Sequence, residues 1–172
     1  MTTLLLARHG ETDWNAEGRL QGHTDRPLND YGRRQASALA EELAGDSIDA
    51  VYSSDLSRAR ETAEIVAGRL GLPVVIEPGL REKNWGSWEG LTPMERDATA
   101  YVGESTEEHR DRTLRTLREI AERHPGTLVL VVTHGGSIRR VQAAVSGFAM
   151  PVIDNCSVWA CACEDGLFRP LD

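Results

Sequence analysis

Two histidines occur in the same local context, and their type and spacing could support chemistry on an anion. His9 follows an apolar run and Arg8, and His134 follows the apolar run 128–132; a glycine comes after each histidine. A neutral histidine can attack an electrophilic centre and form a covalent intermediate. An arginine beside it can bind phosphate or carboxylate through forked hydrogen bonds. The pair therefore indicates a site for an anionic group.

The elements that must position these residues alternate between strands and amphipathic helices. Both apolar runs are typical of strands buried on both faces of a parallel sheet. Further strands are expected at 49–53, 74–77 and 157–163, and helices at about 29–43, 56–70, 105–124 and from 135 onwards. Residues 13–27 are expected to form a surface loop and 78–104 an irregular segment. The pattern predicts a three-layer α/β sandwich with a mostly parallel sheet and helices on both faces.

Four polar residues follow four of these strands, so the topology brings them to one crevice at the carboxyl edge of the sheet. Arg58 follows the second strand and Glu82 the third, and they join His9 and His134. Each residue alone has an ordinary structural interpretation, such as a surface ion pair or a solvated acid. Together they could bind a phosphoryl group, attack it and protonate a leaving alkoxide.

Composition restricts the partners. The chain has 172 residues, enough for one domain, and a formal net charge of −8, which argues against general nucleic-acid binding. No apolar run approaches the roughly 20 residues of a membrane span. We therefore expect a cytoplasmic protein, either a monomer or a homodimer. The five histidines show no spacing typical of metal ligands, so neither a metal nor another cofactor is expected.

Further motifs surround these residues and run through nearly the whole chain. With them the sequence resembles the histidine phosphatase superfamily, which has the phosphoglycerate-mutase-like fold. The matching blocks follow the order of that family: Arg8–Thr12 with Trp14 and Asn15; Gln21–Leu28 with Gly32, Gln35 and Ala36; Ser53–Ala59 with Thr62 and Ala63; Leu80–Glu82 with Trp85, Gly86 and Trp88–Gly90; Val132–Gly136; and Asn155–Ser157.

The resemblance assigns roles to the candidate residues. It implies that His9 is phosphorylated during turnover and that Glu82 donates a proton to the leaving group. It implies that the phosphoryl group is bound by Arg8, Arg58, His134 and Asn15, without a metal. Gln21, Gly22 and Gly135 are further candidates for substrate or phosphate binding. Gln21 and Gly22 lie in the loop expected to set specificity, and Gly135 opens a helix where glycine lets backbone amides approach an anion closely. Outside this set, His23 and Arg26 are expected to be solvated, and Trp85 and Trp88 to brace the Glu82 loop.

The family contains both phosphatases and mutases, and the segment after the Glu82 block bears on the choice. This insert is short, about residues 91–104, and contains one basic and three acidic side chains. A short acidic lid should neither shield a phosphohistidine from water nor bind a second anion. We therefore expect a metal-independent phosphatase that hydrolyses small phosphomonoesters. The alternatives are a 2,3-bisphosphoglycerate-dependent phosphoglycerate mutase and a regulatory module that binds phosphate esters without turnover.

Overall fold

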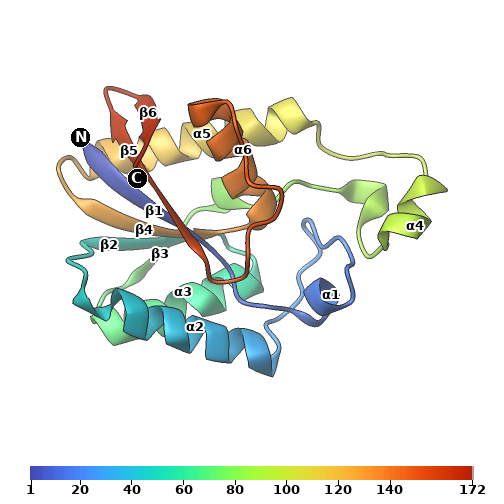
Figure 1. The fold of residues 1–172 in the computed structure, drawn as a ribbon, viewed down its shortest axis with the longest axis horizontal. Coiled ribbons are helices and arrows are strands. Elements are labelled where there is room, and N and C mark those ends of the chain that lie inside the picture. The colour runs from blue at the N-terminus through green and yellow to red at the C-terminus, as the bar shows by residue number, and fades with distance from the viewer. Residues whose placement is uncertain (172) are drawn as a thin grey trace.

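A six-stranded sheet separates two pairs of helices in the computed structural model, which describes residues 1–171 (Figure 1). The strands follow the order β3-β2-β4-β1-β5-β6 across the sheet. The first four in this order are parallel, and β5 and β6 are antiparallel to their neighbours. The strands are β1 (Thr2–Arg8), β2 (Ala50–Ser53), β3 (Val74–Ile76), β4 (Leu128–Thr133), β5 (Val158–Glu164) and β6 (Leu167–Pro170). The predicted mostly parallel α/β fold is confirmed.

The helices cover both faces of the sheet. In Figure 1, α2 (Asp30–Glu42) and α3 (Ser57–Leu70) lie on one face, and α5 (Thr106–Arg123) and α6 (Gly135–Ser146) on the other. Two short helices, α1 (Asp13–Ala16) and α4 (Pro93–Asp97), lie beyond the carboxyl ends of the parallel strands. None of the helices in residues 1–171 combines the length and the apolar character needed to cross a bilayer.

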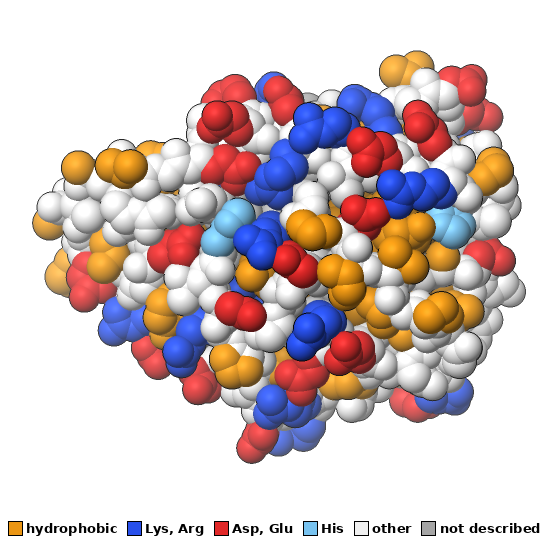
Figure 2. All heavy atoms as spheres, turned by 180° about the vertical axis from the view of Figure 1, so that it is seen from behind, with side chains coloured by type: hydrophobic (Ala, Val, Ile, Leu, Met, Phe, Trp, Pro, Cys, Tyr) orange, Lys and Arg blue, Asp and Glu red, His pale blue; other side chains and the backbone are white. Residues whose placement is uncertain are grey.

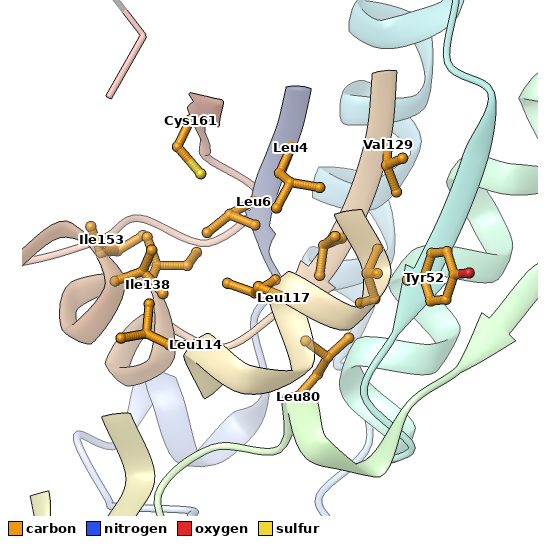
Figure 3. Packing of buried hydrophobic residues seen from close by; sticks show 13 residues of the cluster. Leu4, Leu6, Tyr52, Leu80, Leu114, Leu117, Val129, Ile138, Ile153 and Cys161 are labelled. Atoms are coloured by element: carbon orange, nitrogen blue, oxygen red, sulfur yellow. The ribbon is translucent and has the colours of Figure 1, made fainter. Parts of the chain in front are cut away.

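The central strands bury alternate side chains in two separate cores. Leu4 and Leu6 of β1 pack with α5 and α6, as Figure 3 shows, whereas Ala7 packs with α2 and α3. In β4, Val129 and Val131 likewise belong to the first core, and the alternate residues belong to the second. Because both faces of the sheet are buried, the runs 4–7 of β1 and 128–132 of β4 are apolar at every position, which is why these strands could be recognised in the sequence.

The helix boundaries follow from their capping residues. Asn29 Oδ1 accepts a hydrogen bond from Gly32 N at 2.7 Å and caps α2. Ser105 forms the predicted capping box of α5 with Glu108. Gly71 ends α3 in the left-handed conformation, with φ 70°. These starts and stops were predicted to within one residue.

Three local predictions were wrong. The expected loop 13–27 contains α1, which a capping box at Thr12 starts. The expected irregular segment 78–104 contains α4 and the 3₁₀ turns Pro78–Leu80 and Gly86–Trp88. The edge strand β6 was not predicted; a turn at Asp165 and Gly166, both with positive φ, joins it to β5. An Asp-Gly pair is a strong hairpin signal, so the sequence did carry evidence for this strand.

Candidate active site

His9 lies immediately after β1, and hydrogen bonds fix both its backbone and its ring. Its N–H donates to Thr133 O at 3.0 Å, and its carbonyl accepts from Asn155 Nδ2 at 2.9 Å. The ring Nδ1 lies 2.6 Å from Gly10 O. Because a carbonyl oxygen can only accept, Nδ1 carries the ring proton. Nε2 therefore has a free lone pair, as a nucleophile requires.

Two arginines lie beside His9, and backbone carbonyls orient both of them. Arg58 is 1% exposed, and it donates to Gly22 O at 2.7 Å and to Thr24 O at 3.0 Å. Arg8 donates from Nη1 to Ile153 O. Within residues 1–171, the Nε atom of each arginine is buried and has no hydrogen-bond partner. Both guanidinium groups therefore retain a donor for an oxyanion.

His134 lies behind His9 at the end of β4. The two ring centroids are 5.2 Å apart, and the ring planes meet at 61°. Ser54 Oγ lies 3.0 Å from His134 Nε2. The other ring nitrogen, Nδ1, is buried and has no protein partner in the described chain.

Burial controls the ionisation of this cluster. It lowers the pKa of His9 well below its usual value, and the charges of Arg58 and Arg8 lower it further. The pKa of His134 is also lowered well below the usual value, first by burial and then by Arg58 and His9. Burial lowers the pKa of Arg58 to about 10. At neutral pH the two histidines are thus neutral and the arginine is charged, which suits binding and attack on an anionic phosphoryl group.

Glu82 reaches the same cleft from the loop after β3. Its Oε2 accepts from Gly136 N at 2.9 Å, and its Oε1 accepts from Lys83 N at 2.8 Å. A Cβ atom at position 136 would lie 2.3 Å from Glu82 Oε1, so a larger residue there would displace the carboxylate. The start of α6 therefore orients the carboxylate of Glu82.

The cleft formed by these groups has a volume of about 230 Å³. Of the residues predicted for the site, seven line it: Arg8, His9, Asn15, Gln21, Arg58, Glu82 and Gly135. Asn15 and Gln21 use their amide oxygens to accept from Thr12, at 3.1 and 2.7 Å. Their amide nitrogens are the groups left to donate to a ligand.

Two predicted residues, Gly22 and His134, are not among the residues that line the cleft. Gly22 instead accepts from Arg58 through its carbonyl, and its φ of 57° together with the nearby Glu89 carboxylate requires glycine. His134 contacts the ring of His9. In this structure both residues contact the groups that line the cleft.

Sequence reasoning missed several lining residues, chiefly Arg139 in α6 and the segment 151–153. Arg139 forms no ion pair among the described residues, and its Nε is buried without a hydrogen-bond partner. Its position one turn into α6, after His134, was a usable signal, because that turn faces the carboxyl edge of the sheet. Segment 151–153 gave no such signal, since it reaches the cleft from a loop.

Two charged residues hold the Glu82 loop from outside the cleft, and neither was predicted to do so. Arg112 of α5 donates to the carbonyls of Gly79, Arg81 and Glu82 at 2.9, 2.9 and 3.2 Å, and it pairs with Glu104. Glu89 accepts from the backbone N–H groups of His23, Thr24 and Trp85 at 2.9, 2.9 and 3.1 Å. These contacts fix the loop by hydrogen bonds rather than by core packing.

Four further residues near the cleft had been assigned structural roles from the sequence: His23, Arg26, Trp85 and Trp88. His23 and Arg26 were expected to be solvated; instead His23 Nε2 lies 2.9 Å from Glu82 O, and Arg26 stacks 5.0 Å over the Trp14 ring. Trp88 braces the loop as expected, by donating to Thr99 O at 2.8 Å. Trp85 stacks on Trp88 and also lines the cleft.

Figure 2 shows the charged side chains on one face of the molecule. There, basic and acidic side chains alternate, and among residues 1–171 no broad area of that face is basic alone. Within the described chain, no group of three or more His, Cys, Asp or Glu side chains is arranged to hold a metal ion.

Comparison with known proteins identifies the family. Residues 4–170 match the model of the histidine phosphatase superfamily, branch 1. A metal-independent phosphoserine phosphatase of Arabidopsis thaliana is 41% identical over 165 residues, which cover 85% of this chain and 69% of that protein. Phosphoglycerate mutase-like protein 4 of the same plant is 43% identical over 155 residues, covering 79% and 67%.

Comparison with solved structures supports the same family. The structure of mycobacterial glucosyl-3-phosphoglycerate phosphatase with VO3 superposes with a TM-score of 0.89 at 30% identity, covering 98% of this chain and 96% of that one. Family, sequence relatives and fold agree with the arrangement of histidines, arginines and carboxylate described above. The chain therefore belongs to the histidine phosphatase superfamily, branch 1, and is a phosphoric monoester hydrolase of that family.

Proposed function

We propose that the protein hydrolyses small phosphomonoesters in two steps on His9, without a metal. In the first step Nε2 of His9 attacks phosphorus, the bond to the leaving oxygen breaks, and Glu82 protonates that oxygen. In the second step Glu82 accepts a proton from water, the water oxygen attacks phosphorus, and the P–N bond breaks. The sum is one ester and one water converted to an alcohol and phosphate.

One observation carries this proposal: the hydrogen bond from His9 Nδ1 to Gly10 O leaves Nε2 free in the cleft that Glu82 also lines. Arg8 and Arg58 provide the positive charge that phosphoryl transfer needs, because this reaction depends mainly on positioning and on charge stabilisation. Asn15, Gln21 and the start of α6 at Gly135 add neutral donors.

Hydrolysis is favoured over isomerisation by the position of the insert. No residue of 91–104 is among those that line the cleft in the described chain. Instead the insert packs on the outside of the Glu82 loop, through Trp88 and Tyr101. A phosphohistidine on His9 would then stay accessible to water, whereas a mutase must protect it.

The cleft also favours a leaving group with its own negative charge. Arg8 and Arg58 suffice to neutralise a phosphoryl dianion, so Arg139 is a surplus cation without a carboxylate partner among residues 1–171. A carboxylate on the leaving group would supply that partner through a forked hydrogen bond. Phosphorylated hydroxy acids such as phosphoserine, the substrate in the name of one relative, have this chemistry.

The test is phosphate release in EDTA from a panel of monoesters. It includes O-phosphoserine, 3-phosphoglycerate, a neutral alkyl phosphate and p-nitrophenyl phosphate, with isomerisation of 3-phosphoglycerate followed in parallel. Metal-independent release, abolished in a folded His9→Ala variant, is the expected result. Isomerisation without release would mean a mutase, and tight binding without either activity would mean a regulatory module. A preference for the two acids that disappears in Arg139→Gln would support the substrate class.

We further propose a cytoplasmic location and a state of monomer or homodimer. The support for a reducing compartment is that all three cysteines are free in the structure. Light scattering on the purified protein distinguishes the two oligomeric states, and fractionation of cells that express it tests the location.

A further inference from the structure

A third buried histidine lies behind Glu82, and the proposed reaction does not use it. His109 belongs to the first turn of α5 and is 1% exposed. Its Nε2 lies 3.6 Å from Glu82 Oε1, whose side chain is 13% exposed. His109 is not among the residues that line the cleft in the described chain. It therefore faces the carboxylate of Glu82 from the protein side.

The hydrogen bonds of His109 indicate which nitrogen carries its proton. Nε2 lies 3.0 Å from Ser137 Oγ, and Ser137 donates its own hydrogen to Arg81 O at 3.3 Å. With that hydrogen used, Ser137 accepts from His109, so the ring proton is on Nε2. The same nitrogen lies 3.0 Å from the serine oxygen and 3.6 Å from Glu82 Oε1. Nδ1 is buried without a partner among residues 1–171.

The ring of His109 is buried, and only one of its two nitrogens has a hydrogen-bond partner among residues 1–171. A buried polar atom without a partner costs free energy that an apolar side chain of similar size would not. His109 packs among buried residues of α5, beside Thr113 and Ser137. Its Nε2 faces the carboxylate of Glu82, which lines the cleft.

The charges around His109 come from four elements of the fold. Burial lowers the pKa of His109, and the negative charge of Glu82 opposes this shift. The other charged or titratable groups that influence it, or that it influences, are Glu104, Arg112, Arg140 and His134. At neutral pH His109 is neutral, and it acts through an N–H rather than through a full charge.

We propose that His109 is a positioning residue for Glu82: its Nε2 faces the carboxylate from the protein side and holds it toward the leaving group. The inference deepens the proposed function and rests on the role of Glu82 in it. His109 itself touches neither the substrate nor the phosphoryl group.

The test compares two substitutions of the same residue. His109→Leu removes the donor and keeps the packing, and His109→Gln keeps an N–H near the position of Nε2. We expect His109→Leu to lower kcat for alkyl phosphates about 5- to 20-fold, less than the roughly 10²-fold effect of removing a general acid, with KM nearly unchanged. The loss should be smaller for p-nitrophenyl phosphate, because a good leaving group needs less proton donation from Glu82. His109→Gln should restore kcat for alkyl phosphates.

The matched control is His124→Gln, at the far end of the same helix. His124 hydrogen-bonds Tyr52 at 2.9 Å and lies roughly 20 Å along α5 from His109. This variant should keep the wild-type kcat for alkyl phosphates. If His109→Leu does not fold, as judged by circular dichroism, His109→Phe serves in its place. A folded variant that keeps the wild-type kcat for alkyl phosphates, or that loses as much with p-nitrophenyl phosphate, would overturn the inference.

Imidazole NMR supplies a readout that needs no turnover. In Glu82→Gln the pKa of His109 should fall below its wild-type value, because the charge that opposed the effect of burial is gone. An unchanged titration of His109 would also overturn the inference. If Glu82→Gln hydrolyses alkyl phosphates at the wild-type rate, the proposed role of Glu82 fails as well. If Glu82→Gln is impaired but His109→Leu keeps the wild-type kcat for alkyl phosphates, only the role of His109 fails.

Discussion

The two sides of the cleft are built in different ways. On the side formed by the strand ends, His9, Arg58 and His134 are at most 3% exposed and follow strands of the sheet. On the other side the segment 78–104 has short helical turns and exposes Met94 by 83% and Val102 by 72%. The first side is thus buried at the ends of the strands, whereas the second is largely exposed and is held by hydrogen bonds to distant residues.

This difference matches the two halves of a phosphate ester. Every substrate presents the same phosphoryl group, so the groups that bind and attack it can be rigid and buried. The leaving group varies between substrates, and Glu82, which protonates it in the proposed reaction, lies on the loop side. Loops carry specificity because they can change without disturbing the core. We therefore expect substitutions on the two sides of the cleft to impair catalysis in distinguishable ways.

Arg58→Gln should have the largest effect. It removes a buried charge from the strand side, and we expect kcat/KM to fall by about 10²- to 10³-fold for all esters alike. Inhibition by inorganic phosphate should weaken in parallel, because product and substrate share this group. Arg58→Lys keeps the positive charge but loses the forked pair of donors, so its kcat/KM should lie between those of the wild type and Arg58→Gln. Steady-state kinetics on several leaving groups measure both kcat/KM and the inhibition by phosphate.

A loss in Arg58→Gln that depends strongly on the leaving group would contradict this comparison. An Arg58→Gln variant that phosphate inhibits as strongly as it inhibits the wild type would also contradict this comparison. Both results would place Arg58 on the leaving group rather than on the phosphoryl group.

The strand side was also the side that the sequence predicted well. Apolar strands buried on both faces are visible as continuous runs, and the residue after each strand must lie at the carboxyl edge. That logic alone brought His9, Arg58, Glu82 and His134 together. The resemblance to a family then supplied their roles, as well as Asn15 and Gln21.

The loop side was predicted poorly for a physical reason. Arg112 binds the carbonyl of Glu82 from 30 residues away, and Glu89 binds the N–H of His23 across 66 residues. Such contacts follow no periodic pattern and no fixed spacing, so the sequence alone does not indicate them. His109 is a similar case, because a histidine on the buried stripe of a helix looks like an ordinary core residue until the fold places Glu82 beside it.

Arg112→Met tests the loop side and should have a smaller effect. Without its three bonds to backbone carbonyls the Glu82 loop loosens, and we expect kcat for poor leaving groups to fall about tenfold. Inhibition by phosphate should stay at the wild-type level, since the strand side is intact. Arg115→Met is the matched control, because Arg115 is an exposed arginine one turn along the same helix. Weakened phosphate inhibition in Arg112→Met alone would show that the two sides are not separable.

The smallest effect concerns stability rather than turnover, and it should come from the strand side. Burial lowers the pKa of His9 and His134 well below the value of about 6.5 that histidine has in an unfolded chain. As the pH falls through 6.5, the unfolded chain takes up protons that the folded protein does not, so folding stability decreases. The melting temperature should therefore fall between about pH 7 and pH 5. In His134→Asn, which removes one of these groups, the fall should be shallower. Thermal unfolding across this range measures it, and parallel curves for the two proteins would mean that His134 does not contribute.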